Sequence, residues 1–147
     1  MDKVTITKEQ LFKAMRLNEQ KEEKNDSVGF KNMISALLHS QTQVHVFHLQ
    51  TKSYAEHKAL QNYYEGIDAI VDGIVESYQG KYDVLTKYDL IKTQDYESLE
   101  KTIMYFEKLD NMIESARKSV KESYIQNQID TVQELIFSTL YKLRFLK

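Results

Sequence analysis

Proline is absent from this chain of 147 residues, and glycine occurs only four times. These two residues build most tight turns, because proline fixes φ and glycine accepts positive φ. An all-β domain with so little of either is improbable, so the sequence favours long helices joined by few turns. The length is that of one domain with a sizeable core. The 41% of hydrophobic and 29% of charged residues are ordinary for a globular protein.

Charge and cysteine content exclude several classes of function. The formal net charge of −2 provides no global field to hold nucleic acid or an anionic membrane. Cysteine is absent, which excludes disulfides, thiolate metal sites and cysteine nucleophiles. The opening MDKVTITKEQ has no apolar segment of a secretory signal, and no apolar run approaches the ~18 residues of a membrane span. We therefore expect a cytoplasmic protein without membrane contact.

Apolar residues recur at helical spacing in four long segments, each with one apolar stripe. The pattern predicts four helices, over residues 28–50, 54–79, 96–124 and 129–146. Gly80 is a suitable residue to end the second helix, and a tight link near IQNQ is expected to separate the third from the fourth.

The first 27 residues form a polar extension that carries the charge run EQKEEKND. Thr7 and Gln10 have the spacing of a capping box, which predicts a short helix over 7–22. The segment NDSVG at 25–29 is expected to end that helix, with Asp26 or Ser27 capping the next one.

The connection over 80–95 is the long one, with room for a short helix. The second helix is about 37 Å long, and a link of this length spans roughly 50 Å when extended. It can therefore cross the whole bundle. One long crossover flanked by short loops is the ferritin-like connectivity. The sequence thus predicts an all-α, ferritin-like four-helix bundle over 28–147.

All four histidines fall within nineteen residues, at His39, His45, His48 and His57. Two interpretations are open: half-buried bundle histidines gathered by chance, or metal ligands. His48 lies at the centre of the first helix's apolar seam, where a satisfied core histidine is also expected. His39 lies away from that seam and is expected at the surface.

Carboxylates follow His57 along one edge of the second helix's apolar stripe. With roughly 100° per residue, all of them fall within about 100° of His57, and only Lys58 at the rim is a cation. A stripe of one sign repels itself unless cations occupy it; the alternative is an acidic solvent face. Oxygen and imidazole ligands suit Fe(II), Mn(II) or Zn(II). The carboxylates are Glu65, Asp68, Asp72 and Glu76.

Helix geometry separates these groups into two clusters. His57 and Asp72 are fifteen residues apart, about 22 Å along the axis, so they cannot share a metal ion within one chain. His45 and His48 can approach His57 across the turn TKSY. Asp72 and Glu76 form a separate pair. A two-fold axis between antiparallel helices would bring one chain's histidines to the other's carboxylates, giving two identical sites per dimer.

The run HVFHLQTKSYAEHKALQNYYEGIDAIVDGIVESYQG resembles the Dps-like (mini-ferritin) branch of the ferritin-like superfamily. That branch typically has a His-Trp pair ending one helix, a His opening the next, and Asp-x-x-x-Glu fifteen residues later. His57, Asp72 and Glu76 keep this spacing. The tail DTVQELIFSTLYKLRFL also resembles the family's last helix. The resemblance spans about residues 28–147, and only the motif over 45–76 is specific.

Departures from the family pattern indicate a divergent member, with phage-encoded proteins as its expected nearest relatives. The chain has no Trp. His48 leaves a loop to His57 three residues shorter than usual, whereas His45 keeps the usual spacing of twelve. Both histidines therefore stay candidates, with a preference for His48. Glu65 and Asp68 are expected to lie around the site rather than to be ligands.

The resemblance implies iron binding, Fe(II) oxidation and iron storage, which protect against oxidative stress. The ligands would be His48, His45, His57, Asp72 and Glu76, with iron as the metal and Mn2+ or Zn2+ as alternatives in the same site. No catalytic group beyond these ligands is expected, and ferroxidase activity itself is left open. The partner would be the chain itself, in two-fold dimers that build a dodecamer. The alternative is a non-catalytic helical bundle that keeps the fold as a structural or interaction module.

DNA binding is a further activity of the family through basic tails. Residues 1–24 contain six Lys and Arg and five Asp and Glu. Counterion release needs several phosphate contacts, so at most weak DNA binding is expected here.

Overall fold

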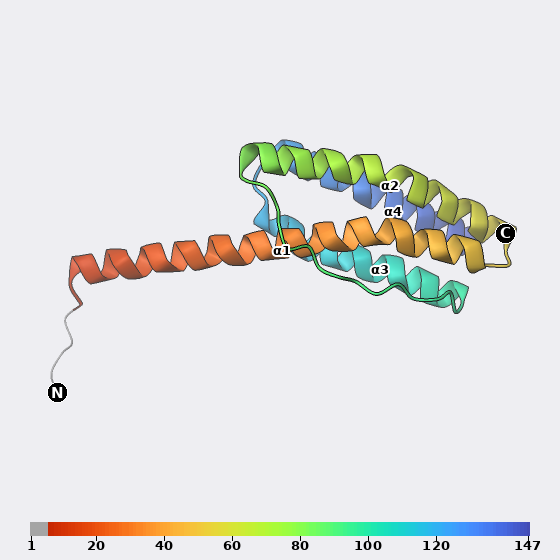
Figure 1. Cartoon of the computed structure of the whole chain (residues 1–147), viewed down its shortest axis with the longest axis horizontal. Coiled ribbons are helices and arrows are strands. Elements are labelled where there is room, and N and C mark those ends of the chain that lie inside the picture. The colour runs from red at the N-terminus through yellow and green to blue at the C-terminus, as the bar shows by residue number, and fades with distance from the viewer. Residues whose placement is uncertain (1–5) are drawn as a thin grey trace, which may run out of the picture.

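The structure, a computed structural model, describes residues 6–147, except for the side chains of 23–26. Every regular element in the described residues is helical (Figure 1). The prediction of an all-α chain with four long helices is confirmed. The elements are α1 (Lys8–Gln50), α2 (Tyr54–Lys81), α3 (Leu99–Ala116), the 3-10 turn η1 (Arg117–Ser119) and α4 (Ser123–Phe145).

The four helices enclose one core. α1 packs against α2 and α3, and α4 packs against the same two helices, so α1 and α4 occupy opposite corners. Apolar residues at helical spacing fill the centre, as the periodicity predicted. The largest fully buried side chains are Tyr63, Phe30, Phe106, Met33, Ile34, Leu37, Leu60, Ile67, Ile74, Ile113, Ile125 and Ile129.

A long crossover, residues 82–98, joins α2 to α3 and lies along α1. Its backbone N–H groups donate in sequence to α1 side chains: Asp89 to Ser35 at 3.0 Å, Gln94 to Gln43 at 2.7 Å and Tyr96 to Gln50 at 2.6 Å. The residue numbers of the partners increase together along both segments, so the crossover runs parallel to α1. It returns the chain to the other end of the bundle (Figure 1). α2 and α3 therefore run in the same direction. The short helix for which this segment had room does not form.

α1 is a single helix of 43 residues, so the predicted end at 25–29 is wrong. Asn, Asp and Ser each cost a helix only tenths of a kcal/mol and Gly about 1 kcal/mol. Without a proline, that is too little to end a helix whose C-terminal half is anchored in the core. The capping box is confirmed: Gln10 N–H donates to Thr7 Oγ1 at 3.3 Å, and Thr7 N–H donates to Gln10 Oε1 at 3.0 Å.

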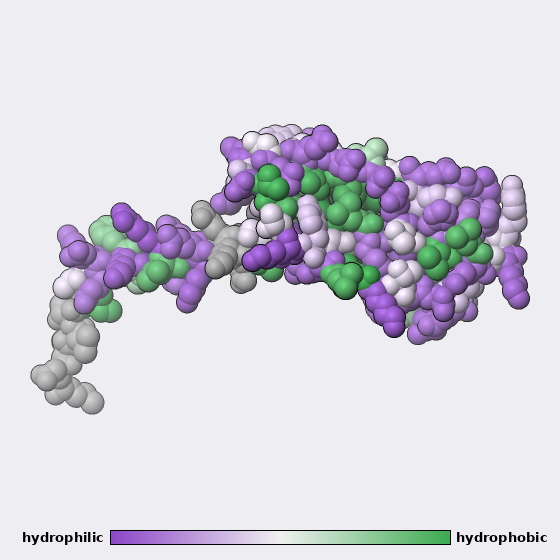
Figure 2. Space-filling model, viewed as in Figure 1, coloured by the Kyte–Doolittle hydropathy of each residue, from purple (hydrophilic) through white to green (hydrophobic). Residues whose placement is uncertain are grey.

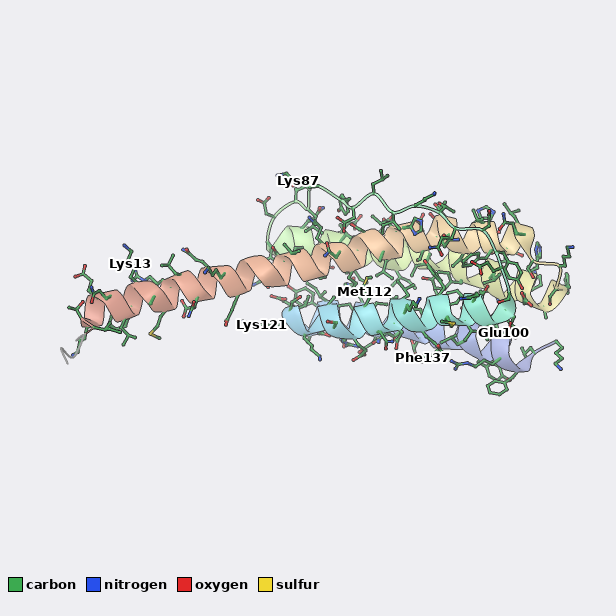
Figure 3. All side chains as sticks on the ribbon, turned by 90° about the horizontal axis from the view of Figure 1, so that it is seen from below. Lys13, Lys87, Glu100, Met112, Lys121 and Phe137 are labelled. Atoms are coloured by element: carbon green, nitrogen blue, oxygen red, sulfur yellow. The ribbon has the colours of Figure 1, made fainter. Side chains whose placement is uncertain are left out.

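The first half of α1 extends beyond the bundle as an arm. Its side chains from residue 8 to residue 22 are exposed, apolar ones included, and Figure 2 shows the apolar ones as separate patches among polar residues. Figure 3 marks the arm with Lys13 and the crossover with Lys87. The expected polar extension over 1–27 is thus continuous with the bundle from residue 8 on, and its first five residues lie outside the description.

Three other predicted boundaries also differ. α2 continues through Gly80 to Lys81. α3 ends at Ala116 rather than at 124, and α4 starts at Ser123 rather than at 129. The Gln126 amide donates to the carbonyls of Arg117 at 2.6 Å and Val120 at 2.5 Å, which stabilises a turn there. Apolar spacing continues across this turn and could not reveal it.

No helix in the described part of the chain is both long and apolar enough to cross a membrane.

Candidate functional site

His48, near the end of α1, and His57, near the start of α2, lie face to face across a short turn. Their ring centroids are 3.6 Å apart with 23° between the planes. His48 Nδ1 is 2.8 Å from the His57 carbonyl oxygen, and His57 Nδ1 is 3.0 Å from the His48 carbonyl oxygen. Ser53 caps α2 by accepting a hydrogen bond from the Glu56 N–H at 3.3 Å, which sets the direction in which α2 starts.

This reciprocal contact determines which ring nitrogens are free. A carbonyl oxygen only accepts, so each Nδ1 carries the proton and donates it. In the neutral ring, Nε2 then keeps its lone pair. Metal-binding histidines use the same arrangement, because a backbone carbonyl on one nitrogen orients the other toward the metal. The pair therefore presents two imidazole nitrogens, one per ring, that form no hydrogen bond with a described residue.

More rings complete the cluster. His45 is 5.7 Å from His48 and stacks on Tyr64 at 4.2 Å, and Tyr64 lies edge-on to His48 at 5.1 Å. Tyr54 lies 6.5 Å from His57. His48 is only 6% exposed, whereas His45 is exposed and His57 is half-buried. The structure thus brings together His45, His48 and His57, as their spacing predicted.

Sequence reasoning did not single out the two tyrosines. Tyr64 belongs to the apolar stripe of α2, and the stripe alone gave no sign that its ring faces histidines. Tyr96 was missed as well: its hydroxyl donates to Glu56 at 2.8 Å and so ties the crossover to the start of α2. Burial and this hydrogen bond raise the pKa of Tyr96.

The acidic residues lie elsewhere on α2. Glu65, Asp68, Asp72 and Glu76 are all exposed. Glu65 accepts a hydrogen bond from the Gln61 amide at 2.7 Å, and the other three form no ion pair or hydrogen bond with any described residue. Because α2 is continuous, Asp72 lies about 22 Å along the axis from His57. One chain does not bring the two clusters together.

A metal site within one chain finds no support elsewhere in the described residues. No group of three or more His, Asp or Glu there could hold a metal ion. The buried polar side chains are Ser, Thr, Gln and His48, so no described carboxylate lies in the bundle core. A metal centre built from the predicted residues needs ligands from a second copy.

His39 is not the surface residue that the helical wheel indicated. It is half-buried beside the crossover, and its Nε2 is buried without a hydrogen-bond partner in the described residues. The wheel of one helix could not show that another segment covers this side of α1.

The comparisons with known proteins identify a family but assign no activity to it. No curated protein and no solved structure matches the sequence. One family matches residues 48–143, a span that begins at His48, includes the acidic edge of α2 and ends within α4. Since this match covers well over half of the chain, the protein belongs to the family of unknown function DUF5856.

Proposed function

We propose that the protein is a Dps-like mini-ferritin that binds Fe(II) between paired chains and oxidises it for storage. The observation that carries the proposal is the pair His48 and His57, whose Nδ1 hydrogens are both held by carbonyls. Further support comes from the unpaired carboxylates of Asp72 and Glu76. The single long crossover between parallel α2 and α3 is compatible with ferritin-like connectivity.

The two clusters meet if α2 pairs antiparallel with its copy across a two-fold axis. The axis must then pass midway between His57 and the acid pair, beside Glu65 and Gly66. α1 runs antiparallel to α2, and His48 lies level with His57. The point on α1 that is level with Glu65 is therefore about eight residues before His48, near Ser40. Exposed apolar side chains on the His45 face of α1 favour such a contact: Leu38 is 38% exposed and Leu49 is 69% exposed.

The proposed reaction takes one electron from each of two Fe(II) ions. Hydrogen peroxide accepts both electrons and two protons, its O–O bond breaks, and two water molecules form. Imidazole nitrogen suits Fe(II), and hard carboxylates stabilise Fe(III) more strongly than Fe(II). Asp72 and Glu76 would therefore favour oxidation. Glu65 and Asp68, near the proposed axis, would keep the surroundings attractive to incoming cations. Mn2+ and Zn2+ would compete for the same ligands.

Mutation of the acid pair tests the ligand assignment. Fe(II) and peroxide are mixed with wild type, with Asp72→Ala/Glu76→Ala, and with the control Glu134→Ala, which removes an exposed acid from α4. We expect the double variant to oxidise iron at least about tenfold more slowly and the control to match wild type. Equal rates in all three proteins would overturn the assignment.

Sharing of the site between chains has its own test. His57→Ala and Asp72→Ala/Glu76→Ala are each inactive in the proposal, but a mixed dimer contains one intact site and one doubly damaged site. Random reassembly of equal amounts should therefore restore about a quarter of the wild-type rate. No gain on mixing would contradict a site made by two chains.

A structural module is the second candidate, favoured by one observation. His48 is 6% exposed and its ring is covered by His57, as expected for histidines that only join two helices. Metal analysis of purified protein after iron loading separates the two functions. Fewer than one metal ion per dimer would favour the module. The Dps-like function predicts about two sites per dimer, and subunit mass would show whether twelve chains assemble.

A further inference from the structure

A pocket of about 370 Å³ lies between α1, the crossover and α3. It is separate from the histidine cluster: His39 lines it, roughly 120° around α1 from His45. The volume is within the range of small-molecule sites, about 300–1,000 Å³. Figure 3 shows α3, with Met112, running beside α1.

The wall of the pocket is largely apolar and aromatic. Phe47 on α1 faces Tyr105 on α3 at 5.6 Å between ring centroids, edge to face. Met104, Leu109 and Met112 extend this surface along α3. Met104 and Met112 are 42% and 43% exposed, so the described residues leave part of the wall uncovered. An apolar body of a ligand would cover it.

One residue that lines the pocket, His39, has a ring nitrogen without a partner in the described part of the chain. His39 Nε2 is inaccessible to solvent and makes no hydrogen bond to any described residue. A buried polar atom without a partner is costly, and native structures have few of them. Burial also lowers the pKa of His39, which favours the neutral ring, and a neutral imidazole has one nitrogen that donates.

Cations exceed anions in the lining of the pocket. Lys92, Lys101 and Lys108 line the pocket, and none forms an ion pair with a described residue. Of the two acids in the lining, Asp95 accepts a hydrogen bond from the Gln50 amide at 2.9 Å. Glu97 is the other. Lys101 and Lys108 are seven residues apart and so lie on one face of α3.

We propose that this pocket binds a small monocarboxylate with an apolar body, of the medium-chain fatty acid class. The chain lies against Phe47, Tyr105 and the α3 methionines. The His39 ring turns so that one of its nitrogens donates to the carboxylate, and the lysines of the lining stabilise its charge. This site requires neither iron nor a second copy, so it stands apart from the proposed oxidation of Fe(II).

Methionine methyl groups provide the test, because two of the methionines line the pocket and two others lie elsewhere. In protein with 13C-labelled methionine methyls, added decanoate should shift Met104 and Met112 with saturation. Met33, which is fully buried in the core, and Met15 on the arm should not move. Decanol, which lacks the charge, should bind at least about tenfold more weakly.

Charge reversal completes the experiment. Lys101→Glu/Lys108→Glu should weaken decanoate binding at least about tenfold, whereas Lys13→Glu/Lys21→Glu on the arm makes the same change in net charge and should leave it unaltered. His39→Leu should weaken it about threefold or more. The proposal is overturned if Met104 and Met112 stay unmoved, if decanol binds equally well, or if both double variants behave alike. Asp72→Ala/Glu76→Ala should bind decanoate normally, so failure of the iron site leaves this result intact.

Discussion

The side chains of His48 and His57 each form a hydrogen bond with the backbone of the other residue. The two rings stack at 3.6 Å, and each Nδ1 donates to the carbonyl oxygen of the opposite residue. The orientation of either ring therefore depends on the position of both helix ends. This contact places the proton of a neutral ring on Nδ1 in both residues, and it leaves each Nε2 without a hydrogen bond to a described residue.

Loss of one ring should destabilise the hairpin of α1 and α2. His48→Ala removes a buried ring and a hydrogen bond, and we expect the free energy of unfolding to fall by about 2–3 kcal/mol. His45→Ala is the control: its ring is exposed, and a loss below about 1 kcal/mol is expected. Urea unfolding followed by circular dichroism, at one protein concentration, measures both. Equal losses would show that the reciprocal contact adds nothing.

The proposed two-fold axis can be tested by cross-linking, because the chain has no native cysteine. Glu65→Cys places a single thiol beside the axis, so a short bifunctional maleimide should join two chains in high yield. Glu134→Cys, on an exposed position of α4, should give little dimer. Denaturing gel electrophoresis gives the answer. Cross-linking at Glu134 alone would place the interface elsewhere.

The side chain of Gln43 holds the crossover on α1. Its amide donates to the Gln94 carbonyl and its oxygen accepts from the Gln94 N–H, both at 2.7 Å. Gln43→Ala should lower the free energy of unfolding by about 1–2 kcal/mol. Trypsin should then cleave faster at Lys87 and Lys92, since the segment opens more often.

The neighbouring exposed residue offers a matched control for this variant. Thr42→Ala should leave both the stability and the cleavage rate close to those of wild type. Unchanged cleavage in Gln43→Ala would mean that other contacts hold the crossover.

Tyr82, just after α2, donates a hydrogen bond to Glu122, just before α4. This bond lowers the pKa of Glu122 from its ordinary 4.5 and raises that of Tyr82 to about 12. A lowered folded pKa for Glu122 means stabilisation that is present above about pH 4.5 and is lost as pH falls through the folded value. A raised pKa for Tyr82 means stabilisation that is present below about pH 10 and is lost as pH rises through about 12.

Tyr82→Phe should therefore be destabilised most near neutral pH and approach wild type at both extremes. Urea unfolding across the pH range measures the difference, with Tyr141→Phe, exposed on α4, as control. A difference that does not change with pH would exclude the contribution of this hydrogen bond to the titration.

The ends of the helices show where local patterns fail. Apolar spacing continues from α3 into α4, yet the chain turns at 117–122, where the Gln126 side chain satisfies two turn carbonyls. The segment at 25–29 carries helix-breaking residues, yet α1 continues through it. In both cases the preference of a few residues is worth about 1 kcal/mol, and packing or a distant side chain outweighs it.

The sequence by itself determined the four helices, their buried faces, the length of the crossover and the approach of His45 and His48 to His57. Helical period, loop reach and turn length are local properties, so they can be deduced from spacing alone. Only the tertiary structure decided which histidine is buried, which ring nitrogens are free, and that His39 lies in a pocket beneath the crossover. Those outcomes depend on atoms that segments far apart in the chain bring together, and no periodicity in one segment encodes them.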